Sequence, residues 1–220
     1  MNKRKYDSFH AYLVKSAHFS GPWEIPELEN VSDTVPGDLI PFSQINRTQN
    51  YNSWVHFYLD DYRFERLWNC PSRYLNQLQK FSGIITPDFS VYCDMPLAEQ
   101  IHNVYRNHAL AYWLSLKGIK IIPNIRWGDE RSYDFCFDGI PKNGIVSVGT
   151  NGCIAVPKCR VLFQKGLAEM VHRISPHTIL VYGSAPMTIF EQYMASGIQI
   201  ISFPAELQKV HRLKTSSGVA

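Results

Sequence analysis

The sequence lacks the short motifs that mark several common chemistries. It contains no CxxC pair, no HExxH, no GxSxG, and neither GxGxxG nor GxxxxGK followed by Ser or Thr. These absences argue against a zinc ribbon, a zincin-type protease, a nucleophile-elbow hydrolase and the common phosphate-binding loops. The five cysteines are odd in number and scattered, so no disulfide framework is indicated and reduced thiols are expected.

Long hydrophobic runs are also missing. No stretch of eighteen apolar residues occurs, whereas a membrane-spanning helix needs about 20. The charged start MNKRKYDSFH is not followed by an apolar segment of signal-peptide length. We therefore expect a cytoplasmic protein without a membrane segment.

Neither positive nor negative charge is in large excess. The net charge is +3, from 22 basic and 19 acidic residues, which is too small to indicate nucleic-acid binding by itself. Short basic runs occur at both ends, and such runs are typical of solvated termini. They comprise Lys3, Arg4, Lys5, Lys209, Arg212 and Lys214. Nucleic acid is therefore a weakly supported partner, and the oligomeric state stays open.

What is present is a regular alternation of strand and helix patterns. Apolar runs of strand length occur at 39–42, 54–59, 83–86, 119–125, 144–148, 178–182 and 198–203. Apolar residues at helical spacing occur at 64–80, 97–117, 160–174 and 187–195, and Pro71 makes two short helices as plausible as one in the first of these. We predict an irregular arm over 1–38 packed on the domain, a single domain over 39–210, and a frayed tail over 211–220.

This alternation predicts an α/β fold with parallel strands, because strand–helix–strand crossovers are right-handed. About seven βα units indicate a TIM-barrel-like but incomplete barrel, since a full barrel has eight. A doubly wound open parallel sheet is the alternative. In either fold the chemistry is expected at the carboxyl ends of the strands.

Several consecutive segments resemble the bacterial and phage family called domain of unknown function 4417. They are VHFYLDDYRFERLWNCPSRYL, GIITPDFSVYCDMP, IHNVYRN, GIKIIPNIRWGDERSYDFCFDGIPKNG, VSVGTNGC and TILVYGS, and together they cover roughly residues 39 to 184. The resemblance implies a protein of a phage or other mobile element. It carries no catalytic residue over, because none is established for the family.

Asp60 and Asp88 are the candidate catalytic residues, because each follows a predicted strand. Two carboxylates at one rim suit general acid–base chemistry or a divalent cation bound through oxygen. The alternative is structural: Asp61 caps the following helix, Asp60 pairs with Arg63 or Arg126, and Asp94 caps the helix near Pro96.

Candidate substrate-binding residues follow the later strands. An arginine beside a tryptophan, as at Arg126 and Trp127, is suited to hold a phosphate or carboxylate while the ring stacks on a base or sugar. The alternative is an ion pair from Arg126 to Asp60, Asp129 or Glu130, with Trp127 as a packing residue. The full set is Asn124, Arg126, Trp127, Thr150 and Tyr182. His102, Asn103 and Arg106 occupy the first turns of the long helix and are expected to support the rim from there.

These residues leave three functions open. The first is an enzyme, a hydrolase or transferase acting on a polar substrate that is phosphorylated or contains a sugar. The second is a non-catalytic protein of a mobile element that binds nucleic acid or a host protein. The third binds a small polar ligand, a nucleotide, without turnover.

Overall fold

Two parallel sheets form the centre of the structure, a computed structural model that describes Asp7 and residues 9–205. The first contains β3 (Leu39–Pro41), β4 (Trp54–His56), β5 (Gly83–Ile85) and β6 (Ile121–Ile122), and the second contains β7 (Ile145–Gly149), β8 (Thr178–Tyr182) and β9 (Gln199–Phe203). Within each sheet the strand order follows the sequence. A parallel bridge between Asn124 and Ser147 links the two sheets, so the predicted parallel α/β architecture is confirmed.

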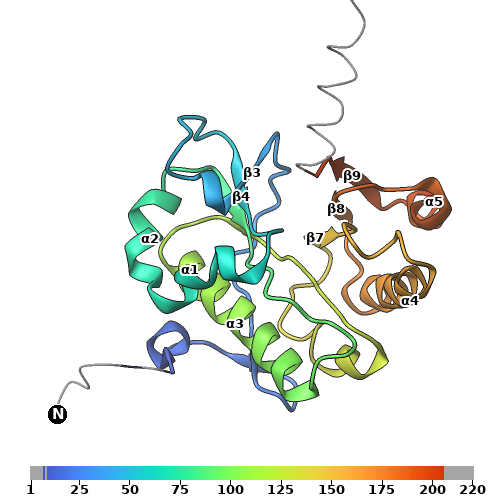
Figure 1. The fold of residues 1–220 in the computed structure, drawn as a ribbon, viewed down its shortest axis with the longest axis horizontal. Coiled ribbons are helices and arrows are strands. Elements are labelled where there is room, and N and C mark those ends of the chain that lie inside the picture. Colours follow the sequence, from blue (N-terminus) through green and yellow to red (C-terminus); the bar gives the residue numbers. More distant parts are fainter. Residues whose placement is uncertain (1–6, 8, 206–220) are drawn as a thin grey trace, which may run out of the picture.

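The helices lie outside the strands. They are α1 (Glu65–Asn69), α2 (Pro71–Leu78), α3 (Leu97–Leu116), α4 (Pro157–Ile174) and α5 (Met187–Ala195). In Figure 1, α1, α2 and α3 lie on the side of β3–β6, and α4 and α5 lie on the side of β7–β9. Among the described helices, none is long and apolar enough to cross a membrane.

The predicted elements differ from the observed ones mainly at their ends. Pro71 divides the segment 64–80 into α1 and α2 and occupies the first turn of α2, where its missing N–H is no loss. The helix predicted over 160–174 starts earlier, at Pro157, because this proline also suits the first turn of a helix. The strand predicted over 119–125 is only two residues long, and Pro123, which has no N–H to donate, follows it.

Alternating side chains explain why the strands are apolar on both faces. Val55, Ile84 and Ile121 point outward and join the core beneath the helices. A second cluster lies on the other face. Six of the strands supply buried residues to it, and residues of the seventh, β9, pack against it. It contains Leu39, Trp54, Ile85, Ile122, Ile145, Leu180, Tyr182 and Ala205, with Ile201 and Phe203 packed against it. Successive residues of a strand alternate faces, so each strand supplies both clusters.

The N-terminal segment contacts the domain through β1 (Phe19–Ser20) and β2 (Ile25–Pro26) and the residues that follow them. Ile25 is buried, and the carbonyl of Pro26 lies 2.8 Å from Nδ1 of His108 on α3. Short 3-10 helices span Ala11–Val14, Phe42–Gln44, Asp61–Arg63 and Glu130–Asp134. The predicted tail 211–220 and the basic residues named at both ends lie outside the described residues.

Candidate functional site

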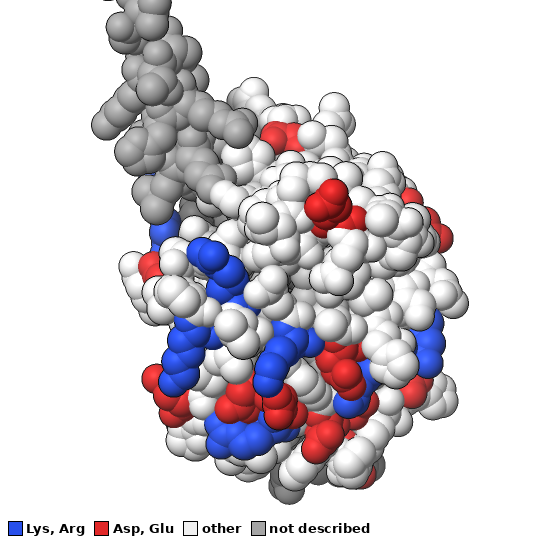
Figure 2. Space-filling model, turned by 90° about the vertical axis from the view of Figure 1, so that its right-hand side faces the viewer, with Lys and Arg blue, Asp and Glu red and all other residues white. Residues whose placement is uncertain are grey.

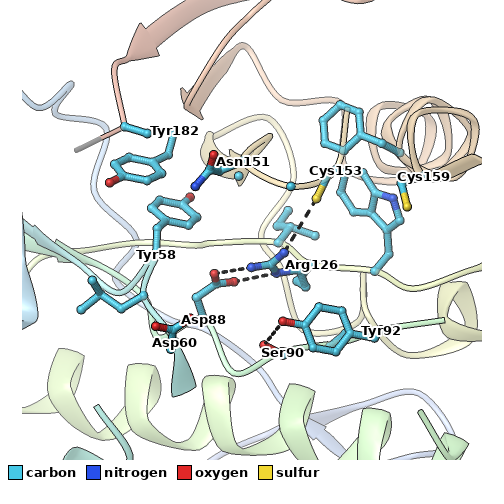
Figure 3. A pocket seen from close by; sticks show the side chains of 18 of the residues that line it. Tyr58, Asp60, Asp88, Ser90, Tyr92, Arg126, Asn151, Cys153, Cys159 and Tyr182 are labelled. Atoms are coloured by element: carbon cyan, nitrogen blue, oxygen red, sulfur yellow. Dashed lines mark hydrogen bonds and ion pairs between the residues drawn. The ribbon is translucent and has the colours of Figure 1, made fainter. Parts of the chain in front are cut away.

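A pocket of about 610 Å³ opens at the carboxyl ends of the strands. At or just beyond the end of each of the seven strands a residue lines it: Pro41, Tyr58, Asp88, Arg126, Gly149, Tyr182 and Ala205. Figure 3 shows Arg126 near the middle of this pocket. The predicted rim residues Asp60, Asp88, Arg126, Trp127 and Tyr182 line the pocket, whereas Asn124 and Thr150 do not.

The central contact of the site is an ion pair between Asp88 and Arg126. Arg126 donates from Nε to Oδ1 of Asp88 at 2.9 Å and from Nη2 to Oδ2 at 2.5 Å. Nδ2 of Asn124 donates to the same Oδ1 at 2.7 Å. Asp88 is 2% exposed, and burial raises the pKa of its carboxyl, a rise that Arg126 and Asn124 oppose. Both carboxylate oxygens are therefore occupied as acceptors.

Arg126 turns its remaining edge toward the pocket. Nη1 lies 3.9 Å from Sγ of Cys153, which is a weak contact. The side chain is 22% exposed, so the guanidinium is held on one edge and reachable on the other. The alternative partners predicted for Arg126 were wrong: Asp129 pairs with Arg131 and Glu130 with Lys165.

The loop that carries Asp88 is held by side chains of α3. Asn107 accepts from the backbone N–H of Phe89 at 2.8 Å and donates to its carbonyl at 3.2 Å. Asn103 donates to the carbonyl of Ser90 at 2.6 Å. Asn103 also accepts from Arg106, so the predicted support of the rim from the long helix is present for these two residues. His102, the third residue predicted to support the rim, is exposed and contacts the ring of Trp68 instead. These buried amides replace the strand partner that the loop lacks.

The predicted helix caps were wrong. Asp61 accepts from the hydroxyl of Ser90 at 2.9 Å and from its N–H at 3.1 Å, and the helix that follows has no side-chain cap. Helix α3 begins after Pro96, again without a side-chain cap, so Asp94 does not cap it. Asp60 lines the pocket and is exposed; among the described residues it forms no ion pair with Arg63 or Arg126.

Trp127 and Thr150 are more enclosed than the sequence pattern indicates. Trp127 is 8% exposed, and its indole N–H donates to the carbonyl of Leu162. A Cβ at Gly166 of α4 would clash with that indole, so the glycine permits the close packing. The Thr150 hydroxyl donates to the carbonyl of Ser184 at 2.8 Å, which directs it away from the pocket.

Two tyrosines form one wall of the pocket. The rings of Tyr58 and Tyr182 stack with centroids 4.5 Å apart and an interplanar angle of 9°. The Tyr58 hydroxyl lies 2.6 Å from Oγ of Ser147 on β7, and burial raises the pKa of Tyr58 well above its ordinary value. Tyr58 therefore connects the end of β4 to the second sheet, a role that its position in a strand pattern does not reveal.

Tyr92 was also missed by the sequence reasoning. It lies in the loop after β5, lines the pocket and is 55% exposed. Its hydroxyl lies 3.1 Å from Oγ of Ser90, the residue that Asp61 holds. The signal available in the sequence is its spacing of four residues from Asp88 in PDFSVYCDMP.

Three thiols, Cys93, Cys153 and Cys159, line the pocket as well. Burial raises the pKa of the Cys153 thiol. In the part of the chain that the structure describes, no three His, Cys, Asp or Glu side chains gather as a metal site. The predicted divalent cation on Asp60 and Asp88 thus lacks a third such ligand there.

The family model described as "Domain of unknown function (DUF4417)" matches residues 17–204. The chain belongs to this family. It is 39% identical over 169 residues to the Gene 1 protein of Mycobacterium phage L5, and 38% identical over 169 residues to the Gene 1 protein of Mycobacterium phage D29. The aligned part is 74% of this chain, 72% of the L5 protein and 62% of the D29 protein. No solved structure gives a significant match.

The pocket lies inside the DUF4417 domain. Every residue that lines it falls within 17–204 except Ala205, which comes directly after the matched segment. The match to the family model and the two phage relatives confirm the predicted family membership. The family description assigns no activity to the DUF4417 pocket.

Proposed function

We propose that this DUF4417 chain binds a small polar ligand in the strand-end pocket and holds its phosphate or carboxylate on Arg126. The proposal rests on one observation: the two edges of the Arg126 guanidinium have different surroundings. Asp88 accepts from Nε and Nη2, while Nη1 faces the pocket with only a weak sulfur contact. A fixed guanidinium presents its donors without losing side-chain entropy when an anion binds.

The surroundings of Arg126 support a small ligand. The pocket volume of about 610 Å³ lies in the range typical of small-molecule sites. Arg63 is exposed at the pocket edge and offers a second positive charge. Asp88 accepts hydrogen bonds from Arg126 and Asn124. Because its negative charge is paired in this way, it repels an incoming anion less than an unpaired carboxylate would.

The fold proposed around this site is an incomplete barrel of seven parallel strands. Three features support it: strand order that follows the sequence, an inner cluster that all seven strands form or pack against, and strand ends that all reach one pocket. A doubly wound sheet reverses its strand order at one point. A barrel places its site at the carboxyl ends of its strands, where this pocket lies.

The two predicted catalytic carboxylates receive different roles in this proposal. Asp88 orients Arg126, because both of its oxygens already accept hydrogen bonds. Asp60 is the carboxylate left for general acid–base chemistry in a hydrolase or transferase. If Asp60 has this role, the wild-type chain forms product from a bound phosphate ester and the Asp60→Asn variant does not.

The nucleic-acid alternative gains no support from the face that carries α4 and α5. On this face Lys and Arg side chains are interspersed with Asp and Glu in the lower part, and the upper part shows a few Asp and Glu side chains but hardly any Lys or Arg (Figure 2). Two ion pairs of α4, Lys165 with Glu130 and Arg173 with Glu169, neutralise basic residues locally. A nucleic-acid footprint is instead a continuous basic patch.

Pyrophosphate binding measured by calorimetry at low salt tests the proposal. Arg126→Gln alone leaves Asp88 buried without its partner, so we choose the double variant Asp88→Asn/Arg126→Gln, which replaces the ion pair by two amides. We expect pyrophosphate affinity to fall at least about tenfold, the effect of losing one charge-assisted hydrogen bond. Arg131→Gln, which removes an exposed arginine five residues away, is expected to bind like the wild type.

Cys153 supplies a second readout that needs no bound ligand. Iodoacetate is anionic and iodoacetamide is neutral, so the ratio of their alkylation rates at Cys153 reports the charge presented by Arg126 next to the thiol. We expect the double variant to lower that ratio and pyrophosphate to slow both reactions in the wild type. Unchanged affinity together with an unchanged ratio would refute the anion site.

A further inference from the structure

Tyr92 is an exposed ring that the structure nevertheless holds in place. It is 55% exposed, so it contributes little to the core. Its hydroxyl lies 3.1 Å from Oγ of Ser90, and Ser90 is bound to Asp61 through both its hydroxyl and its backbone N–H. An exposed aromatic side chain otherwise changes rotamer within picoseconds to nanoseconds. The ring of Tyr92 is therefore fixed at the pocket without packing into the core, and this placement suits contact with a ligand.

The other rings of the pocket are already used within the protein. Tyr58 and Tyr182 stack on each other. Trp127 packs against Phe137 and Phe163 and is 8% exposed. The stacking role that the sequence predicts for Trp127 therefore passes to the exposed ring of Tyr92.

Tyr92 and Arg126 are placed to act on one ligand. Figure 3 shows Tyr92 on one side of the Arg126 guanidinium and the Tyr58–Tyr182 pair on the other. A ligand with its anionic group on Arg126 thus has an aromatic face beside it.

We infer that the ligand is a nucleoside monophosphate, with its phosphate on Arg126 and its base stacked on Tyr92. This inference rests on the proposed function, because it uses Arg126 as the anchor. Stacking on an aromatic side chain suits any base, since each has a π-face, and strengthens binding by about 5- to 150-fold. Asn151 also lines the pocket, on the other side of Arg126 from Tyr92. Its side-chain amide can form hydrogen bonds with the polar groups of the ligand.

The test compares nucleotides with ribose 5-phosphate, which lacks only the base, and with pyrophosphate, which reports the anion site alone. Calorimetry at low salt is carried out with AMP, GMP, CMP, UMP, ribose 5-phosphate and pyrophosphate. For the wild-type chain we expect at least one nucleotide to bind about tenfold or more tightly than ribose 5-phosphate. Tyr92→Ala is expected to remove that preference while leaving ribose 5-phosphate affinity within about twofold, because the anchor on Arg126 is untouched.

Two further variants separate the ring from its hydroxyl and from general surface effects. Tyr92→Phe keeps the ring and loses only the contact with Ser90, so it is expected to retain most of the nucleotide preference. Tyr62→Ala removes a tyrosine that is 78% exposed and does not line the pocket, and it is expected to bind like the wild type.

The possible failures have different meanings. Equal affinity for ribose 5-phosphate and for all four nucleotides overturns the inference and leaves the anion site standing. A nucleotide preference that survives in Tyr92→Ala overturns the assignment of Tyr92. If neither pyrophosphate nor any phosphorylated ligand binds the wild-type chain, the proposed function itself is wrong.

Discussion

Replacing Asp88 with asparagine is expected to lower the free energy of unfolding by about 3 kcal/mol, the loss typical of a buried ion pair deprived of one partner. The carboxylate is 2% exposed and accepts three hydrogen bonds, two from Arg126 and one from Asn124. An asparagine offers one acceptor oxygen and places an NH₂ group against donors. Arg126 would then keep its charge with no counterion beside it.

Urea unfolding at pH 7 measures this effect, with Asp60→Asn as the matched control. Asp60 carries the same charge, lines the same pocket and is exposed, so its replacement is expected to change stability by less than about 0.5 kcal/mol. The double variant Asp88→Asn/Arg126→Gln should recover part of the loss, because it removes the unpaired charge. A single variant as stable as the wild type would mean that the ion pair does not hold the site together.

Stability is expected to fall between about pH 6.5 and pH 4 because of His108. This side chain is buried on α3 beside the carbonyl of Pro26, and burial lowers its pKa to about 4. In the unfolded chain the pKa is about 6.5. Between these values the unfolded state binds more protons than the folded state, so stability decreases as the pH falls.

The size of the effect follows from the two pKa values. At pH 5 the unequal protonation of His108 costs about 2 kcal/mol relative to pH 7.5. Urea unfolding of wild type and His108→Gln at both pH values isolates this contribution, because all other titrating groups are shared. We expect the variant to lose about 2 kcal/mol less than the wild type on acidification. Equal losses in the two proteins would assign the pH dependence to other residues.

Much of the fold follows from local patterns in the sequence. The apolar runs predict all seven strands of the two sheets, and the helical spacing predicts α3 and α5 to within one residue at each end. These elements are predictable because a strand buried on both faces and an amphipathic helix each leave a period in the chain. Pro71 and Pro157 carry a local signal too, since proline suits the first turn of a helix.

Part of the site could also be predicted. Asp60, Asp88, Arg126, Trp127 and Tyr182 were placed at one rim because they follow parallel strands, and all five line the pocket. Their roles were less predictable. Asp61 and Asp94 stand where helix caps are common, yet no local rule shows that Ser90 will reach Asp61 across 29 residues.

The sequence by itself determined the parallel α/β class, the family and the edge of the sheet at which polar side chains gather, because these depend on period and order along the chain. Only the tertiary structure decided that Asp88 is committed to Arg126, that Trp127 is buried against Gly166, and that Tyr92 stands at the mouth of the pocket. Such assignments depend on contacts between residues far apart in sequence. Their free energies are set by burial and by which donor meets which acceptor, and neither is visible before the strands are brought together.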